Sequence, residues 1–162
     1  MATIIIGLGN PVLTDDGVGI HAARCLASHL ADQKEVSVRE MYVGGLELME
    51  AMIGYDRAIL IDAIITGNTE PGEFHKTELY SLKQSRNTAS NHDASLTIAL
   101  ELGKLLGQQL PGQVDVWAVE AQEVDTFGER MSEPLQRAFP HLIRQLLAEV
   151  GMGNIDSGGR CS

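Results

Sequence analysis

The feature that most constrains the fold is an isoleucine-rich run at residues 3–8 that leads directly into a glycine-rich loop. Such a run is typical of a strand that is buried on both faces of a parallel sheet. Apolar residues then recur at helical spacing and predict a helix over about 16–31, with Asp15 or Asp16 as its N-cap. The chain therefore opens with a strand–loop–helix unit.

The same alternation of elements continues along the chain. We expect strands over 36–43, 57–65 and 114–119, an edge or antiparallel strand over 72–79, a polar loop over 81–90, and helices over 46–53 and 93–106. The last helix is expected over about 140–149, because Pro140 should separate it from a short turn of helix before it. This order predicts a three-layer α/β/α sandwich around a twisted, mostly parallel sheet of about five strands.

Length and composition set the other limits. With 162 residues, the chain fits one domain over 1–150 and a Gly/Ser-rich tail over 151–162, with a monomer as the default. A net charge of −10 excludes a protein whose main function is to bind nucleic acid, and it disfavours binding to an anionic membrane. Asp62 interrupts the longest apolar stretch, so no membrane span is expected. Cys25 and Cys161 predict neither a disulfide framework nor a cysteine zinc site, and they fit a reducing cytoplasm.

Three polar side chains are candidates for chemistry. Asp16 lies at a predicted helix start, Asp62 ends an apolar strand, and His92 lies at the start of another helix. Taken one at a time, they also fit a helix cap, a turn and an exposed histidine. The glycine-rich loop is a weak candidate for nucleotide binding, because it lacks the third glycine of the dinucleotide spacing and its aspartates would repel a phosphate.

Taken together, the three residues suggest a metal site. Ligands of parallel sheets lie outside the carboxyl ends of the strands, which is where Asp16, Asp62 and His92 are expected. Two carboxylates and one imidazole suit a divalent ion such as nickel or zinc and leave coordination positions open. Open positions suit catalysis, or a metal that arrives on a substrate.

A set of motifs in the same order resembles the hydrogenase maturation endopeptidases, which process the large subunit of nickel–iron (NiFe) hydrogenases. The resemblance extends across most of the chain, and its strength is in the ordered set rather than in any one motif. The motifs are GLGN at 7–10, DDGVG at 15–19, GLEL at 45–48, IDA at 61–63, SNH at 90–92 and FGERMSEP at 127–134.

The resemblance implies a metal-dependent, aspartic-type endopeptidase with an α/β fold. It implies that Asp16, Asp62 and His92 occupy the metal-binding positions, with Asp16 or Asp62 as a candidate general base. It also implies that the enzyme removes the C-terminal peptide of a hydrogenase large-subunit precursor after nickel insertion. The nickel is then carried by the precursor's own cysteines, and the enzyme holds no tightly bound metal.

The sequence departs from the family's pattern in one segment. Many members have an Asp before a Gly-Gly-Thr-like turn after the second strand, whereas this chain has Glu40 and a different turn over 41–45. The departure bears on which hydrogenase subclass is served.

Two other functions compete with the endopeptidase. Peptidyl-tRNA hydrolases share a Gly-Leu-Gly-Asn-Pro opening, but here no histidine follows it until His21, and the acidity opposes tRNA binding. A non-catalytic nickel-binding module on the same fold is the other alternative.

Overall fold

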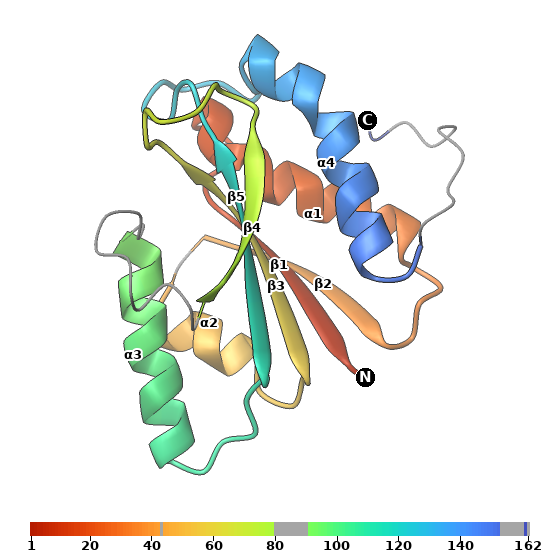
Figure 1. Cartoon of the computed structure of the whole chain (residues 1–162), viewed down its shortest axis with the longest axis vertical. Coiled ribbons are helices and arrows are strands. Elements are labelled where there is room, and N and C mark those ends of the chain that lie inside the picture. The colour runs from red at the N-terminus through yellow and green to blue at the C-terminus, as the bar shows by residue number, and fades with distance from the viewer. Residues whose placement is uncertain (43, 80–90, 153–160, 162) are drawn as a thin grey trace.

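The computed structural model describes residues 1–42, 44–79, 91–152 and 161, with only the backbone for 91–94. Five strands form one sheet in the order β2-β1-β3-β5-β4 (Figure 1). All neighbouring pairs are parallel except β4 with β5, which is antiparallel. The strands are β1 (Thr3–Leu8), β2 (Val36–Met41), β3 (Arg57–Ile64), β4 (Phe74–Glu78) and β5 (Gln113–Glu120).

Helices cover both faces of this sheet. In Figure 1, α1 and α4 lie on one face and α2 and α3 on the other. The helices are α1 (Val18–His29), α2 (Leu46–Ala51), α3 (Asn91–Leu105) and α4 (Glu133–Glu149), and a 3-10 turn, η1 (Thr14–Gly17), precedes α1. The expected three-layer α/β/α sandwich with a mostly parallel sheet is therefore confirmed, including the antiparallel edge strand.

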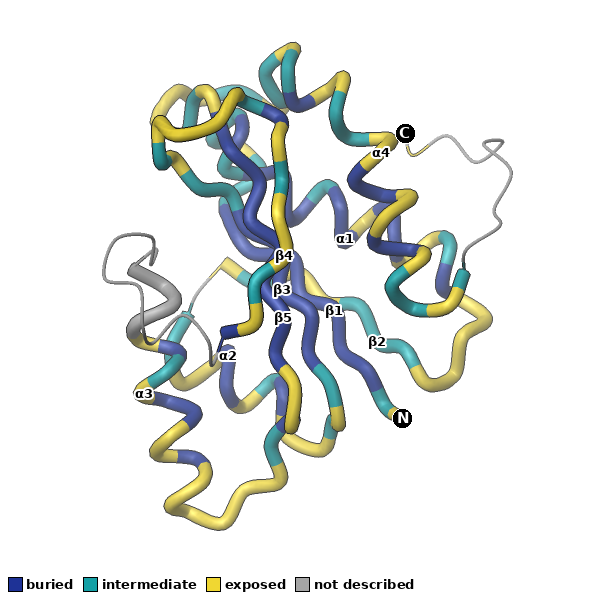
Figure 2. Tube along the Cα trace, in the orientation of Figure 1, coloured by how far each residue is buried: buried dark blue, intermediate teal, exposed yellow. Residues whose placement is uncertain are grey.

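The core has one apolar layer on each side of the sheet. Side chains of alternate residues in β1 point to opposite faces, so Ile5 packs under α1 and α4 while Ile4 and Ile6 pack under α2 and α3. Figure 2 shows β1, β3 and β5 largely buried, whereas β2 and β4 at the edges are more exposed. None of the helices in the described part of the chain combines the length and the hydropathy that a membrane span requires.

The expected break at Pro140 is wrong, because α4 runs through it without interruption. A proline inside a helix costs about 3 kcal/mol, since it removes a hydrogen bond and crowds the preceding turn. Pro140 lies on the exposed side of α4, where water can reach the carbonyl that loses its partner. Buried residues of the same helix stabilise it against the core, namely Leu135, Leu142, Ile143, Leu146 and Leu147.

The glycine-rich loop serves close packing at the start of α1. A Cβ on Gly19 would lie 2.3 Å from the carbonyl oxygen of Ile61 and 2.5 Å from that of Leu8. Gly9 has a φ of 125°, and a Cβ there would lie 1.9 Å from the carbonyl oxygen of Asp16. Only glycine allows these contacts, and they bring η1 and α1 directly against β1 and β3.

Replacing Gly19 by alanine is therefore expected to lower the free energy of unfolding by about 1–3 kcal/mol, because the helix must move away from the strands. Urea unfolding measures this loss. Gly112→Ala is the matched control, because nothing lies within 4 Å of its would-be Cβ. Equal stability of the two variants would contradict the packing role of Gly19.

Candidate active site

Asp62 lies near the carboxyl end of β3, where the sequence places it. The residue is only 7% exposed, and its Oδ1 accepts a hydrogen bond of 2.9 Å from the backbone N–H of Ala63. The parallel register pairs Gly7 of β1 with Ile61 of β3, so Asp62 is the next residue along toward the carboxyl edge. A nearly buried carboxylate is thus held at the edge where ligands of parallel sheets bind.

Asp16 reaches the same edge from η1, the turn that follows the loop after β1. Its half-buried carboxylate accepts a hydrogen bond of 2.8 Å from the backbone N–H of Asn10. The turn η1 also contacts β3, the strand that carries Asp62. The two predicted carboxylates therefore lie on adjoining elements, although they are far apart in the sequence.

The third predicted ligand, His92, belongs to the first turn of α3, and its side chain is outside the described residues. The position of that turn can be judged from Ser95, whose Oγ would lie 3.8 Å from a Cβ on Gly45. Gly45 precedes α2 and follows β2, whose last residue, Met41, accepts a hydrogen bond from the N–H of Gly9. The start of α3 is therefore close to the carboxyl ends of β1 and β2, and the role of His92 as a ligand stays a prediction.

Asp15, one of the two residues predicted as the N-cap of α1, does not cap that helix. The N-cap of α1 is Gly17, without a side-chain hydrogen bond. Asp15 is fully buried and accepts hydrogen bonds from the N–H groups of Gln122, Glu123 and Ser132 and from the Ser132 hydroxyl, at 2.6–3.0 Å. It therefore fixes η1 to the segment between β5 and α4.

Backbone hydrogen bonds strengthen the same connection. The N–H of Thr14 donates to the carbonyl of Gly128 and the N–H of Gly128 to the carbonyl of Val12, both at 2.9 Å. Residues 121–132, here called the rim segment, thus lie beside the loop that carries Asp16. Phe127 of this segment is 84% exposed. The sequence did not predict this connection, although the FGERMSEP motif and the two adjacent aspartates, which supply its two partners, were both recognised as motifs.

Glu120 is another buried carboxylate, at the end of β5, and its hydrogen bonds are directed into the fold. It accepts bonds of 2.8 and 2.9 Å from the N–H groups of Thr66 and Gly67 and one of 2.9 Å from the Thr66 hydroxyl. Burial raises the pKa of Glu120, but these hydrogen bonds outweigh it and hold the pKa below its usual range. An ionised Glu120 therefore shapes the loop after β3.

Comparison with known proteins identifies the family. The sequence profile described as HycI, hydrogenase maturation protease, matches residues 20–149, which is well over half of the chain. The chain belongs to the hydrogenase maturation protease family. Membership decides against the peptidyl-tRNA hydrolase alternative.

Individual members of the family show how far the likeness extends. The chain is 24% identical over 149 residues to the hydrogenase expression/formation protein HupD of Thiocapsa roseopersicina, a match covering 86% of this chain and 66% of HupD. It is 29% identical over 72 residues to the hydrogenase 2 maturation protease of Escherichia coli, covering 44% of each chain. The solved structure of the maturating endopeptidase HybD from E. coli has a TM-score of 0.69 at 21% identity, over 93% of this chain and 94% of HybD, and it supports the shared fold.

Glu40, the residue that departs from the family's pattern, lies in β2 and is held by α1. Its carboxylate accepts hydrogen bonds of 3.1 and 3.2 Å from Arg24 Nε. His21 lies one turn before Arg24, and burial together with the charge of Arg24 lowers its pKa, while Glu40 acts in the opposite direction. In this member of the hydrogenase maturation proteases, Glu40 thus forms part of a charged contact between α1 and β2.

Proposed function

We propose that the chain is an endopeptidase that removes the C-terminal peptide of a NiFe hydrogenase large-subunit precursor after nickel insertion. The observation that carries the proposal is the placement of Asp16 and Asp62 on adjoining elements at the carboxyl edge of the sheet, in a chain of the maturation protease family. The start of α3, with His92, lies at the same edge.

Nickel enters this reaction as part of the substrate. Asp16, Asp62 and His92 offer two oxygen ligands and one nitrogen ligand, a set that suits a borderline divalent ion. Three ligands leave positions for the cysteines of the precursor, so the enzyme binds the loaded precursor more tightly than the empty one. This difference in affinity makes the site a checkpoint for nickel insertion.

Hydrolysis needs an activated water and a polarised carbonyl. Substrate-bound nickel can polarise the scissile carbonyl or lower the pKa of a bound water. Asp16 or Asp62 then acts as the general base, since either carboxylate can accept the proton of the attacking water. The enzyme is on this proposal both metal-dependent and aspartic in type.

The test compares two forms of one precursor. Purified enzyme is incubated with the large-subunit precursor with and without nickel, and release of the C-terminal peptide is followed by mass spectrometry. We expect cleavage of the nickel-loaded form alone. Equal cleavage of both forms would overturn nickel recognition, and cleavage of neither would overturn the endopeptidase assignment.

Phe127 offers an apolar contact for the precursor beside the site. It is 84% exposed on the rim segment, next to the residue that pairs with the loop of Asp16. Large aromatic side chains contribute most to protein interfaces, so Phe127→Ala is expected to lower kcat/KM by about tenfold, mainly through KM, without changing the melting temperature. Leu105→Ala at the far end of α3, where Leu105 is 86% exposed, is the matched control. An unchanged KM in the Phe127 variant would exclude this contact.

A further inference from the structure

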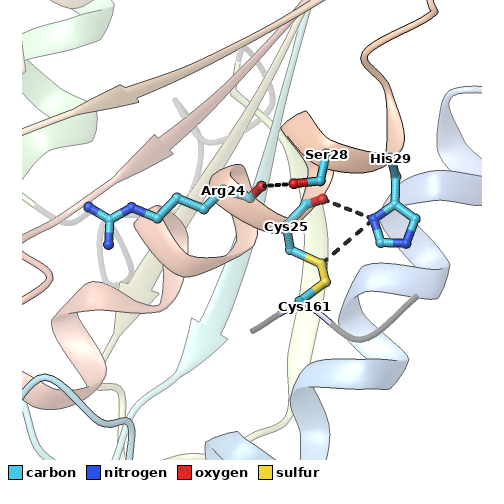
Figure 3. The surroundings of a disulfide bond; sticks show 5 residues. All are labelled: Arg24, Cys25, Ser28, His29 and Cys161. Carbon is cyan, nitrogen blue, oxygen red and sulfur yellow. Dashed lines mark hydrogen bonds between the residues drawn. A yellow bond between two sulfur atoms is a disulfide. The ribbon is translucent and has the colours of Figure 1, made fainter. Parts of the chain in front are cut away.

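Three side chains that the proposed reaction does not use come together beside α1. Cys25 and His29 lie one helical turn apart on α1, and Cys161, from the end of the chain, lies against them (Figure 3). The two sulfur atoms and a ring nitrogen of His29 all lie within 4.8 Å of one another. The two cysteines are joined as a disulfide, with Cα atoms 5.2 Å apart, a separation typical of such bonds.

The geometry on α1 also suits a metal ion. His29 Nδ1 lies 3.9 Å from Cys25 Sγ. Around a tetrahedral zinc ion, bonds of about 2.3 Å to sulfur and about 2.0 Å to nitrogen place these two ligand atoms about 3.6 Å apart. The helix therefore already holds one sulfur and one nitrogen near ligand spacing. His29 Nδ1 also lies 2.9 Å from the carbonyl oxygen of Cys25, and metal ligation replaces that contact, with the ring proton on Nε2.

The surroundings allow an ion to enter from solvent. Cys25 is only 4% exposed and lies within α1, whereas Cys161 is exposed, so an ion can reach the site from solvent on the Cys161 side. Cys25, His29 and Cys161 all line a cavity of about 900 Å³ that is also lined by residues of α4. A fourth coordination position is therefore open to water or a small ligand.

We propose that Cys25, His29 and Cys161, when both cysteines are reduced, bind one thiophilic divalent cation of the zinc class. The disulfide in Figure 3 is the oxidised, metal-free state of the same site. Binding converts two thiols to thiolates and releases two protons. The bound state is lost by oxidation. A small disulfide such as oxidised glutathione takes two electrons from the two protein thiolates and is reduced to two thiolates. The protein disulfide then forms and the cation leaves.

This site differs from the candidate active site in ligand chemistry and in place. It offers two sulfurs and one nitrogen toward the C-terminal end of α1. Asp16 instead precedes the start of α1, and Asp62 follows Ile61, whose carbonyl oxygen lies against Gly19 in the first turn of that helix. A bound cation fastens the end of the chain to α1, as the disulfide does. Metal and disulfide exclude each other, so the state of the site depends on the redox conditions.

The test uses the full chain, reduced and freed of metal, and titrates it with Co²⁺. We expect one equivalent to bind with thiolate-to-cobalt charge-transfer absorption, which carboxylate and imidazole ligands do not give. Zn²⁺ should displace the cobalt and remove the band, and the disulfide form should give no band. A reduced protein without the band would overturn the proposal.

Variants identify the ligands. Cys161→Ser and His29→Ala should each weaken Co²⁺ binding by at least the 10–100-fold that outer-shell changes typically cause. Cys161 is exposed, so its variant keeps the test valid even if Cys25→Ser fails to fold. His75→Ala, an exposed histidine of β4, and Asp16→Asn should leave the band unchanged. Unchanged Co²⁺ affinity in either Cys161→Ser or His29→Ala would overturn the three-ligand site.

Discussion

Asp62→Asn is expected to lower the rate of precursor processing by about 10²–10⁴-fold while the fold persists, the loss typical of removing a general base or its equivalent. The amide keeps an oxygen that can accept the N–H of Ala63, so the hydrogen bond to Oδ1 survives. It removes the negative charge that a metal ligand or a base needs. Asp16→Asn should behave in the same way, because an amide oxygen can still accept the N–H of Asn10.

The measurement is single-turnover cleavage of the nickel-loaded precursor, with circular dichroism and a melting curve for each variant. Asp32→Asn is the matched control, since it removes one carboxylate from an exposed turn far from the site. His92→Ala should also stop processing without unfolding the protein. If the Asp16 and His92 variants both still process the precursor, the assignment of these residues is wrong.

The two aspartates can be told apart by their pattern of loss. A residue that only holds the substrate's nickel should raise KM for the loaded precursor and leave kcat less affected. A general base should lower kcat and remove the acidic limb of the pH–rate profile. One aspartate showing each pattern would assign both roles.

Much of the fold could be predicted from local pattern. The β-branched run that contains Asp62 predicts a central strand, and the carboxylate near the end of that run predicts a binding or catalytic site there. Both predictions need only the residues next to each other in the sequence. The predicted helix break at Pro140 is wrong, because α4 is stabilised by packing against core residues that are distant in the sequence.

Long-range contacts limit what can be predicted of the site. The hydrogen-bond partners of Asp15 lie 107 to 117 residues away, so its role in holding the rim segment leaves no periodic signal near it. The cysteine pair is separated by 136 residues, and nothing in the spacing of two isolated cysteines predicts their contact. Such contacts depend on how the sheet brings distant loops together.

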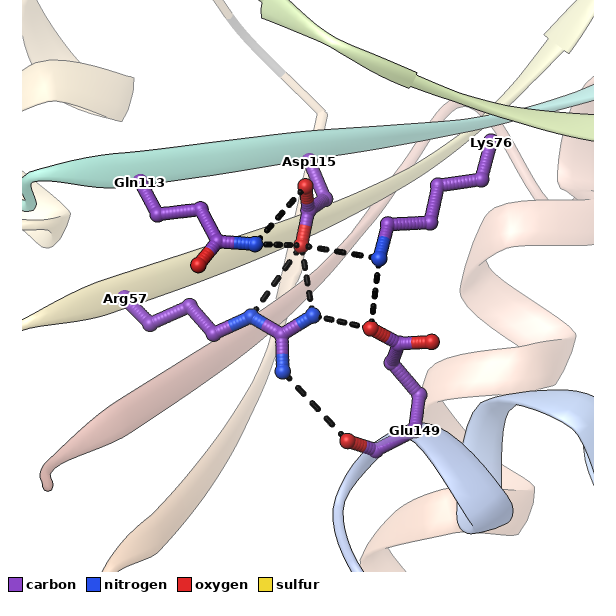
Figure 4. Close-up of polar contacts among 5 residues, drawn as sticks. All are labelled: Arg57, Lys76, Gln113, Asp115 and Glu149. Carbon is purple, nitrogen blue, oxygen red and sulfur yellow. Dashed lines mark hydrogen bonds and ion pairs between the residues drawn. The ribbon is translucent and has the colours of Figure 1, made fainter.

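A charged network lies near the amino ends of β3 and β5, away from the candidate site, and should contribute to the stability of the fold. Arg57 at the start of β3 donates to Asp115 of β5 with its Nε at 3.0 Å, and it also pairs with Glu149 at the end of α4 (Figure 4). Lys76 of β4 bonds to the same Glu149 oxygen at 2.6 Å, and Gln113 donates to Asp115 at 2.9 Å. The network thus joins three strands to the last helix.

Asp115→Asn is expected to lower the free energy of unfolding by about 1.5–3 kcal/mol at pH 7, because Arg57 loses the more buried of its two carboxylate partners and keeps only Glu149. The side chains of Arg57 and Asp115 are only 11% and 2% exposed, so water compensates little of this loss. Urea unfolding measures the difference. Glu133→Gln is the matched control: its ion pair with Arg137 is 72–78% exposed on the surface of α4, and its loss should change stability by less than about 1 kcal/mol.

The pH dependence separates a charge effect from a packing effect. Burial raises the pKa of Asp115, but hydrogen bonds from Arg57 and Gln113 and the charges of Arg57 and Lys76 outweigh it, so the folded-state pKa lies below the ordinary 3.8. A carboxyl with a lowered pKa contributes stability above its unfolded pKa and loses it as the pH falls through the folded value. The gap between wild type and Asp115→Asn should therefore be constant from about pH 7 to about pH 5 and shrink below about pH 4. A gap that stays the same at low pH would mean that Asp115 acts through its shape and not through its charge.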